Sequence, residues 1–123
     1  MFVNALLTDQ LVAEHLGRVL SSNDTLTAIH LESNFIGNEG LEAIADGLRA
    51  NQTLTDLKLA NQRPVSAVSQ STELLVADSV QANHTLLGLT IELRSTRARE
   101  LTQKALSRNR EERRLERRRA ATV

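Results

Sequence analysis

Three histidines, His15, His30 and His84, are the side chains of this chain best suited to bind a metal or transfer a proton near neutral pH. None has a second ligand at the close spacing that metal motifs use. The absence of cysteine excludes thiolate zinc sites and disulfides. No glycine-rich phosphate loop, nucleophile elbow or paired-carboxylate site is recognisable. The sequence therefore predicts a binding protein rather than an enzyme, with no metal, cofactor or small-molecule substrate.

Charge is the second chemical feature, and it is unevenly distributed. Residues 94–119 hold eleven Arg or Lys and four acids, which leaves four bases and eleven acids in the rest of a chain whose formal net charge is +0. A basic end could contact an acidic protein, nucleic acid or an anionic membrane, or could be a solvated helix end with pairs such as Glu111–Arg114. Because no aromatic residue accompanies the arginines, the stacking platform of a single-strand nucleic-acid site is missing. We expect a protein partner and no nucleic acid.

The composition predicts a core of small aliphatic side chains. Hydrophobic residues make up 41% of the chain and aromatic residues 2%, so Leu, Ile, Val and Ala must fill the interior. The apolar start, residues 1–7, is too short to span a membrane and lacks the basic flank of a signal peptide. We expect a cytoplasmic protein without a membrane segment.

Internal repeats organise the chain. The motif Asn-x-Thr-Leu-x-x-Leu-x-Leu, with Ile at some of its leucine positions, occurs in units that start near residues 23, 51 and 83. Its first leucine recurs after 28 and then 32 residues, close to the roughly 20–29 residues of leucine-rich repeats. The longer interval indicates an insertion around Arg63 and Pro64. The motif's apolar positions are Leu26, Ile29, Leu31, Leu54, Leu57, Leu59, Leu86, Leu89 and Ile91.

Each unit predicts one strand and one helix. The two-residue alternation predicts a half-buried strand, and apolar spacing predicts helices over 9–21, 39–50, 69–82 and from 96 onward. Neighbouring units must stack to bury their apolar faces, so we expect an α/β, right-handed leucine-rich-repeat solenoid with parallel strands on its concave side, helices on its convex side and a C-terminal basic helix. The expected buried faces of the first and third helices are Leu11, Val12, Leu16, Val19 and Leu20, and Leu74, Leu75, Ala77 and Val80.

The apolar pattern also predicts the domain organisation. We expect the chain to start inside a partial first repeat, and the apolar pattern ends at Asn109 except for Leu115. We expect a repeat domain over residues 1–109 and a basic, charged helical extension or tail over 110–123.

Asn23, Asn51 and Asn83 open the three units within Asn-x-Thr triplets that match the glycosylation acceptor pattern. We interpret the triplets as part of the repeat, which needs Asn at the turn and Thr before the strand. Because Asn tolerates the left-handed backbone conformation, we expect each to form a left-handed helix C-terminal cap.

The outward strand positions form three columns on the exposed face of the predicted sheet. Such faces often bind partners in solenoid proteins, although an ordinary solvated sheet surface is an equal interpretation here. His30 is the one histidine on this face, and we expect it to be a contact residue rather than a catalyst. The columns are Ala28, Asp56 and Gly88; His30, Lys58 and Thr90; and Glu32, Ala60 and Glu92.

Two stretches carry a family resemblance. Thr25-Leu-Thr-Ala-Ile-His-Leu-Glu-Ser-Asn-Phe-Ile-Gly37 and Asn51-Gln-Thr-Leu-Thr-Asp-Leu-Lys-Leu-Ala-Asn-Gln-Arg63 resemble the leucine-rich-repeat half of tropomodulins and leiomodins, with repeats of the ribonuclease-inhibitor type. The resemblance covers most of the chain from about Asp24 onward. Tropomodulins cap actin filament pointed ends and leiomodins nucleate filaments. The resemblance thus implies an actin-binding, cytoskeletal protein that could cap pointed ends.

The resemblance also implies which residues would contact actin. In that family the strand-to-helix loops and the final helix form the site, and a basic final helix on an acidic body would orient docking onto acidic actin. The matching positions are Ser33, Asn34, Phe35, Asn61, Gln62, Arg63, Arg97, Arg99, Arg110, Arg113, Arg114 and Arg117.

The chain departs from the family's pattern at three places. The strand Gly88–Leu93 lacks the family's aromatic residues, the insertion at 64–71 lacks its Gln and Glu run, and no tropomyosin-binding region is present. We therefore expect no tropomyosin binding by this chain alone. The alternative function is a generic leucine-rich-repeat adaptor with a partner other than actin.

Overall fold

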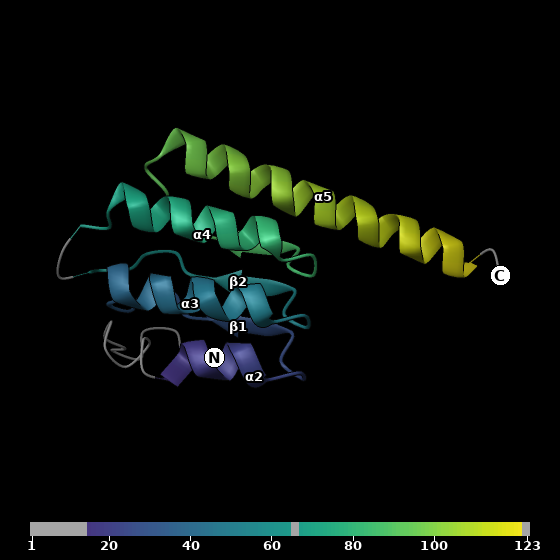
Figure 1. Cartoon of the computed structure of the whole chain (residues 1–123), viewed down its shortest axis with the longest axis horizontal. Helices are drawn as coiled ribbons and strands as arrows, with labels where there is room; N and C mark the ends of the chain where they lie inside the picture. The colour runs from purple at the N-terminus through teal and green to yellow at the C-terminus, as the bar shows by residue number, and fades with distance from the viewer. Residues whose placement is uncertain (1–14, 65–66, 122–123) are drawn as a thin grey trace.

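The computed structural model describes residues 15–64 and 67–121. Strands and helices alternate along the chain, as the repeats predict, and the elements lie in repeating units stacked side by side (Figure 1). The part of the predicted first helix before residue 15 lies outside the described residues. The elements are α2 (Gly17–Ser22), β1 (Ala28–His30), α3 (Asn38–Ala50), β2 (Asp56–Lys58), α4 (Gln70–Ala82), β3 (Gly88–Thr90) and α5 (Thr96–Ala121).

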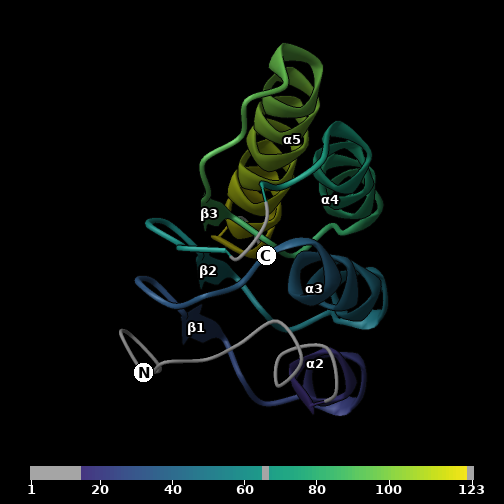
Figure 2. The ribbon, with the colours of Figure 1, turned by 90° about the vertical axis from the view of Figure 1, so that its left-hand side faces the viewer.

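The three strands form one parallel sheet in the order β1-β2-β3. Figure 2 shows this sheet on one side of the molecule and helices α2, α3 and α4 on the other. The register aligns Ala28 with Asp56 and Gly88, and aligns His30 with Lys58 and Thr90. The register confirms these two of the predicted outward columns, whereas the third column lies beyond the ends of the paired strands.

The core fills the space between the two layers with aliphatic side chains. Ile29 and Leu57, the inward residues at the strand centres, are 2% and 0% exposed, and Ile44 of α3 is 1% exposed. The predicted buried faces need correction. Val19 is 41% exposed and was wrongly assigned to the core, and α4 buries Val76 in preference to its half-buried neighbours Leu74 and Leu75. Leu11 and Val12 lie outside the described residues.

The asparagine that opens each unit is extended, so the left-handed cap predicted for it is wrong: φ is −82° at Asn23, −82° at Asn51 and −97° at Asn83. Each carboxamide oxygen instead accepts backbone N–H groups two and three residues later, as from Thr53 and Leu54 at 3.0 and 2.7 Å from Asn51. The extended backbone is what aims the side chain back at these donors.

The carboxamide nitrogens link successive units. Nδ2 of Asn51 donates to the carbonyls of Leu20 and Asn23, at 2.9 and 3.2 Å. Nδ2 of Asn83 donates in the same way to the carbonyls of Leu48 and Asn51, at 2.8 and 2.9 Å. We call this series the asparagine ladder. It satisfies backbone carbonyls that the stacking of the units buries.

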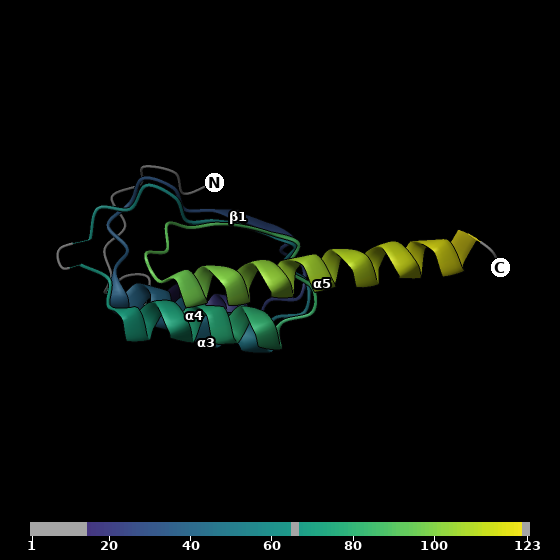
Figure 3. The same ribbon diagram turned by 90° about the horizontal axis from the view of Figure 1, so that it is seen from above.

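Helix α5 closes the stack. It packs against α4 and lies over β3, and it presents Ala98, Ala105 and Leu106 to the core (Figure 2). Asn109 adds the last rung of the asparagine ladder, because its Nδ2 donates to the carbonyls of Asn83 and Leu86 at 3.0 and 2.8 Å. Beyond this residue α5 projects past the other helices (Figure 3). No described helix has the length and apolarity needed to cross a membrane.

Candidate functional site

The loops that lead from β1 to α3 and from β2 to α4 begin with the same unusual backbone conformation. Ser33 and Asn61 have φ values of 61° and 62°, and they are the two non-glycine residues with positive φ in the described chain. Left-handed backbone costs an ordinary residue about 1–2 kcal/mol. Contacts between the loops offset this cost: Nδ2 of Asn61 donates to Oγ of Ser33 at 3.1 Å, and the Ser33 N–H donates to the Ala60 carbonyl at 3.2 Å.

The second residue of each loop is a structural support. Asn34 is 1% exposed, and its Nδ2 donates to the carbonyl of Leu31 at 3.0 Å. Gln62 is half-buried, and its Nε2 donates to the Leu31 carbonyl at 2.6 Å while its Oε1 accepts the Ile36 N–H at 3.1 Å. The Gln62 amide thus joins the adjacent loops, whereas that of Asn34 fastens its own loop to the end of β1, and Asn34 has almost no surface with which to contact a partner.

The flanking loop residues form a shared surface. Ser33, Phe35, Asn61 and Arg63 line one hollow of about 320 Å³. Asn61 and Arg63 are exposed, and Phe35, one of two phenylalanines in the chain, is half-buried. The structure therefore brings four of the predicted site residues together into one patch, which we call the loop patch. Aromatic and arginine side chains in such a patch are the types that most often dominate binding energy.

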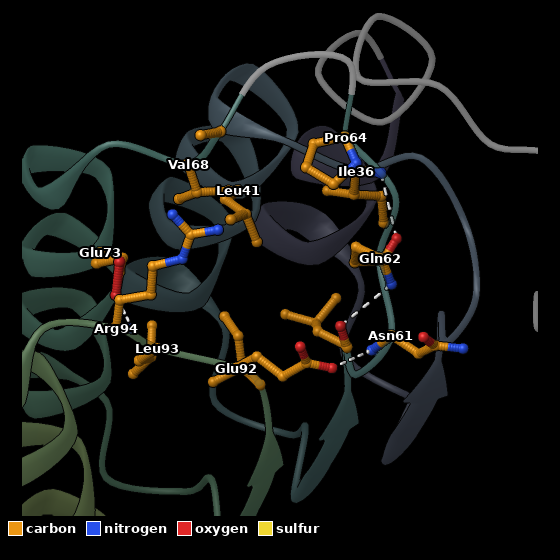
Figure 4. A pocket seen from close by; sticks show the side chains of 13 residues that line it. Ile36, Leu41, Asn61, Gln62, Pro64, Val68, Glu73, Glu92, Leu93 and Arg94 are labelled. Carbon is orange, nitrogen blue, oxygen red and sulfur yellow. Dashed lines mark hydrogen bonds between the residues drawn. The ribbon is translucent and has the colours of Figure 1, made fainter.

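A second hollow lies beside the loop patch, between the two loops and the segment before α5 (Figure 4). Its walls include Glu73, Glu92 and Arg94, which the sequence analysis did not assign to a site. Glu92 accepts the Asn61 N–H at 2.9 Å, so it helps to hold the loop patch. Glu73 is 3% exposed and occurs inside an apolar helix pattern, and nothing in that pattern marks it as a loop anchor.

Glu73 positions the start of α5. Its Oε1 accepts the backbone N–H groups of Arg94 and Ser95, at 2.5 and 3.0 Å. A buried carboxylate that accepts two backbone N–H groups satisfies donors that the turn into the helix would otherwise leave unpaired. Arg97 and Arg99 lie on the first turn of α5, at the same end of the molecule as the loop patch, and both are exposed.

The remaining predicted arginines lie at the other end of α5. Arg113 and Arg117 are four residues apart, Arg110 and Arg114 are also four apart, and all four side chains are exposed. We call them the arginine stripe. From Arg97 to Arg113 the helix rises about 24 Å, since each residue adds about 1.5 Å. The stripe projects from the end of the molecule at which α3 and α4 finish, opposite the loop patch. The structure therefore divides the predicted site into two regions, one at each end (Figures 1 and 3).

One arginine of the stripe, Arg114, forms an ion pair with Glu111 on the same helix. The Arg114 guanidinium donates to the Glu111 carboxylate at 2.6 and 3.0 Å, and this hydrogen bond lowers the pKa of Glu111 and raises that of Arg114. Both side chains are more than half exposed, so the pair holds side-chain geometry more than it stabilises the fold.

Two of the three histidines, His30 and His84, lie beside carboxylates at the surface. Nε2 of His30 lies 3.3 Å from Oδ2 of Asp56 on the exposed face of the sheet, as expected for an outward residue, and Nδ1 of His84 lies 3.2 Å from Oε2 of Glu112 on α5. Within residues 15–64 and 67–121, no group of three or more potential metal ligands comes together.

A stack of strand-and-helix units closed by a long helix, with an exposed loop patch, defines a leucine-rich-repeat domain. The family model of the TMOD/LMOD leucine-rich domain matches residues 1–112, and the chain belongs to this family. The prediction of a tropomodulin- and leiomodin-type repeat domain is thereby confirmed.

Individual relatives agree with this assignment. Human (Homo sapiens) leiomodin-3 is 34% identical over 106 residues, which are 86% of this chain and 19% of the relative. Mouse (Mus musculus) leiomodin-1 is 36% identical over 109 residues, or 89% of this chain and 18% of the relative. The chain thus spans less than a fifth of the length of these relatives.

Two solved structures share the fold. One is that of leiomodin-1 actin-binding site 2 (ABS2), with a TM-score of 0.87 and 31% identity, covering 98% of this chain and 68% of the other. The tropomodulin C-terminal domain from Caenorhabditis elegans has a TM-score of 0.80 and 30% identity, covering 94% of this chain and 68% of the other. These matches confirm the predicted α/β fold with a small parallel sheet and helices.

Proposed function

We propose that this domain binds actin, and that it acts by binding rather than by catalysis. The observation that carries the proposal is the likeness, over 98% of the chain at a TM-score of 0.87, to a leiomodin domain named as an actin-binding site. Actin binding places the protein in the cytoplasm, at the cytoskeleton.

Two regions would share the contact. The loop patch offers Ser33, Phe35, Asn61 and Arg63 for direct contact, with Arg97 and Arg99 at the same end, while Asn34 and Gln62 hold the loops in place. The arginine stripe (Arg110, Arg113, Arg114 and Arg117) would supply a second, electrostatic contact from the extension that we propose begins at residue 110. A long partner surface is needed to touch both regions at once, and an actin filament end offers subunits in a row.

Two further features of the fold, its handedness and its basic last helix, are part of the same proposal. We infer a right-handed solenoid, because parallel strands joined by a crossing helix are right-handed in about 98% of cases. Its last helix would serve as a basic arm: residues 94–119 carry a net charge of +7 and the rest of the chain −7. Such an asymmetric charge distribution orients the encounter with an acidic surface and makes binding depend on salt.

The test separates the two regions. One variant removes the loop contacts (Phe35→Ala with Arg63→Ser), and a second removes three charges from the stripe (Arg110→Ser, Arg113→Ser and Arg117→Ser). Substitution is preferable to truncation after Ser107, because truncation would also delete Asn109 and its two hydrogen bonds to the body. The matched control is Lys104→Gln, a charge lost from an exposed position of α5 outside both regions.

Binding would be measured by co-sedimentation with actin filaments and by titration of actin monomers. We expect each multiple variant to weaken binding about tenfold, the loss of roughly 1.4 kcal/mol, and the control to bind normally. Elongation of pyrene-actin from gelsolin-capped seeds would show whether the domain slows pointed-end growth. If the unaltered chain binds neither filaments nor monomers, the proposal is wrong, and recovery of a different protein in a pull-down would support the adaptor alternative.

A further inference from the structure

The edge of the sheet beside α5 has unpaired backbone groups. β3 is the last strand of the described sheet, and on its inner side the Gly88 N–H donates to the Thr55 carbonyl at 3.0 Å while the Thr90 carbonyl accepts the Leu59 N–H at 2.7 Å. Backbone groups alternate in direction along a strand, so Leu89 and Ile91 direct theirs outward. No strand of the described chain pairs with this edge, which leaves it able to accept another strand.

Two arginines of α5 mark the limits of the open edge. Nε of Arg110 donates to the Leu87 carbonyl at 2.8 Å, and NH1 of Arg99 donates to the Leu93 carbonyl at 3.1 Å. These arginines are eleven residues apart on the helix, or about 16 Å. Each guanidinium has five N–H donors, so both keep donors for a further partner. The open part of the edge lies between two positive charges.

A groove lies between these two arginines. It has a volume of about 380 Å³ and an apolar floor that includes Leu89, Ile91 and Leu106. Leu89 and Ile91 are half-buried, whereas the equivalent Leu57 in β2 is 0% exposed. The difference arises because no further unit follows β3, and α5 covers the strand only in part.

A buried hydroxyl in the groove lacks a hydrogen bond. Thr102 of α5 lines the groove and is 4% exposed, and its Oγ1 has no partner. Shielding of a strand edge would account for the two arginines. It does not account for a buried, unpaired hydroxyl above an apolar floor, because such a hydroxyl is unfavourable unless an acceptor reaches it.

We propose that this groove binds an extended peptide in which an apolar residue lies between two acidic residues, each two positions away, and that the peptide adds to β3 as a fourth strand. Residues i, i+2 and i+4 of a strand share one face, so the apolar side chain meets the floor while the acids meet Arg99 and Arg110. The two acids are four residues apart, or about 13 Å along a strand, and the long side chains of Glu and Arg can bridge the few ångströms that remain to the separation of the arginines. A peptide carbonyl or side-chain oxygen satisfies Thr102.

Charge favours this occupant over a second copy of the chain. Pairing of two β3 edges would bring the arginines of one copy close to those of the other, and like charges across an interface oppose association. An acidic peptide neutralises the same two positions. The proposal is independent of actin binding, because its test contains no actin.

The probe is a panel of fluorescein-labelled synthetic peptides, Ser-Glu-Thr-Φ-Thr-Glu-Ser, in which Φ is Leu, Ile, Val or Phe. Fluorescence polarisation measures affinity for the full chain, and the control peptides carry Lys in place of both Glu residues. Amide NMR locates the site. We expect at least one acidic peptide to bind saturably, and none of the basic peptides to bind. In the NMR spectrum, the amide signals of Leu89 and Ile91 should shift and exchange more slowly when the acidic peptide is bound.

Variants distinguish the groove from general attraction to a basic helix. Arg110→Gln and Thr102→Val each remove one proposed contact, and we expect each to weaken peptide binding about fivefold. Lys104→Gln removes a charge from α5 outside the groove and is expected to bind as the unaltered chain does. Far-UV circular dichroism would confirm that every variant is folded.

Three results would overturn the proposal. The first is that no peptide of the panel binds at millimolar concentration. The second is that Lys104→Gln weakens binding as much as Arg110→Gln, which would indicate non-specific attraction. The third is reversible dimerisation in analytical ultracentrifugation with shifts at the β3 edge, which would assign the edge to a second copy.

Discussion

The asparagine ladder predicts that one atom exchanged at Asn83 will destabilise the domain strongly. Asn83→Asp preserves the shape and the two accepting interactions, in which Oδ1 receives the N–H groups of Thr85 and Leu86 at 2.9 and 2.8 Å. It replaces the Nδ2 donor, which lies 2.8 and 2.9 Å from the carbonyls of Leu48 and Asn51, by an oxygen. Two buried carbonyls thereby lose their donor and meet a negative charge.

The expected cost follows from these contacts. The substitution leaves two buried carbonyls without a donor, at about 1–3 kcal/mol each, which gives an expected loss of roughly 2–6 kcal/mol. Asn83 is 2% exposed, so solvent cannot replace the lost donor. A small domain is stable by about 5–15 kcal/mol in total, and the substitution therefore removes a large share of that free energy.

Urea denaturation followed by circular dichroism measures the effect, and the same motif offers its own control. Asn23 accepts the N–H groups of Thr25 and Leu26 at 2.9 and 2.7 Å, but its Nδ2 makes no hydrogen bond within the described chain. We expect Asn23→Asp to change the free energy of unfolding by about 0.5 kcal/mol or less. Equal losses for the two variants would refute the argument that the donor side of the ladder stabilises the stack.

The pH dependence of the same variant provides a second check on the reasoning. We expect burial and the two facing carbonyl oxygens to raise the pKa of the carboxyl introduced by Asn83→Asp more than the two accepted N–H groups lower it. The folded state then binds a proton more tightly than the unfolded state, so the variant gains stability as the pH falls from 7 towards 4. The protonated carboxyl also regains one donor. If the difference in unfolding free energy between the variant and the unaltered chain stays constant from pH 7 to 4, the negative charge of the new carboxylate plays no part in the lost stability.

Three further substitutions test other contacts by the same denaturation measurement. Thr102→Val removes a buried hydroxyl without a partner and should raise the free energy of unfolding by about 1 kcal/mol. Gly47→Ala places a methyl group 2.6 Å from Cβ of Leu20, where α3 meets α2, and should cost about 2 kcal/mol despite the better helix propensity of Ala. Glu73→Ala leaves two N–H groups before α5, including that of Ser95, without their acceptor and should cost about 2–4 kcal/mol.

The fold was predictable because its signals are local and repeated. The Leu-x-x-Leu-x-Leu motifs place Ile29 and Leu57 inside, and the equal offsets of the units predict the register that joins Ala28, Asp56 and Gly88. The error at Val19 has a physical reason. Among the described helices, α2 packs against α3. Its buried face is therefore narrower than the apolar spacing suggests.

The geometry of the candidate site was less predictable, because it depends on contacts between segments far apart in the sequence. The motif indicated that Ser33 and Asn61 occupy equivalent loop positions, but not that a side chain of one would bond to the other 28 residues away. Glu73 reaches the start of α5 across 21 residues, and no periodic pattern records such a contact. The distance between the loop patch and the arginine stripe follows from α5 being one continuous helix over Thr96–Ala121, which the apolar pattern did not predict beyond Asn109.

Helix α5 meets three structural requirements that favour different residue types, and this explains its irregular apolar pattern. As a closing helix it needs small residues such as Ala98 and Ala105 against the body, and as the last rung of the ladder it needs Asn109, a poor helix former, at a buried position. The edge of β3 requires charged groups opposite its carbonyls, which Arg99 and Arg110 provide. Arg99, Asn109 and Arg110 therefore supply hydrogen bonds at the end of the stack that a further repeat unit would otherwise provide.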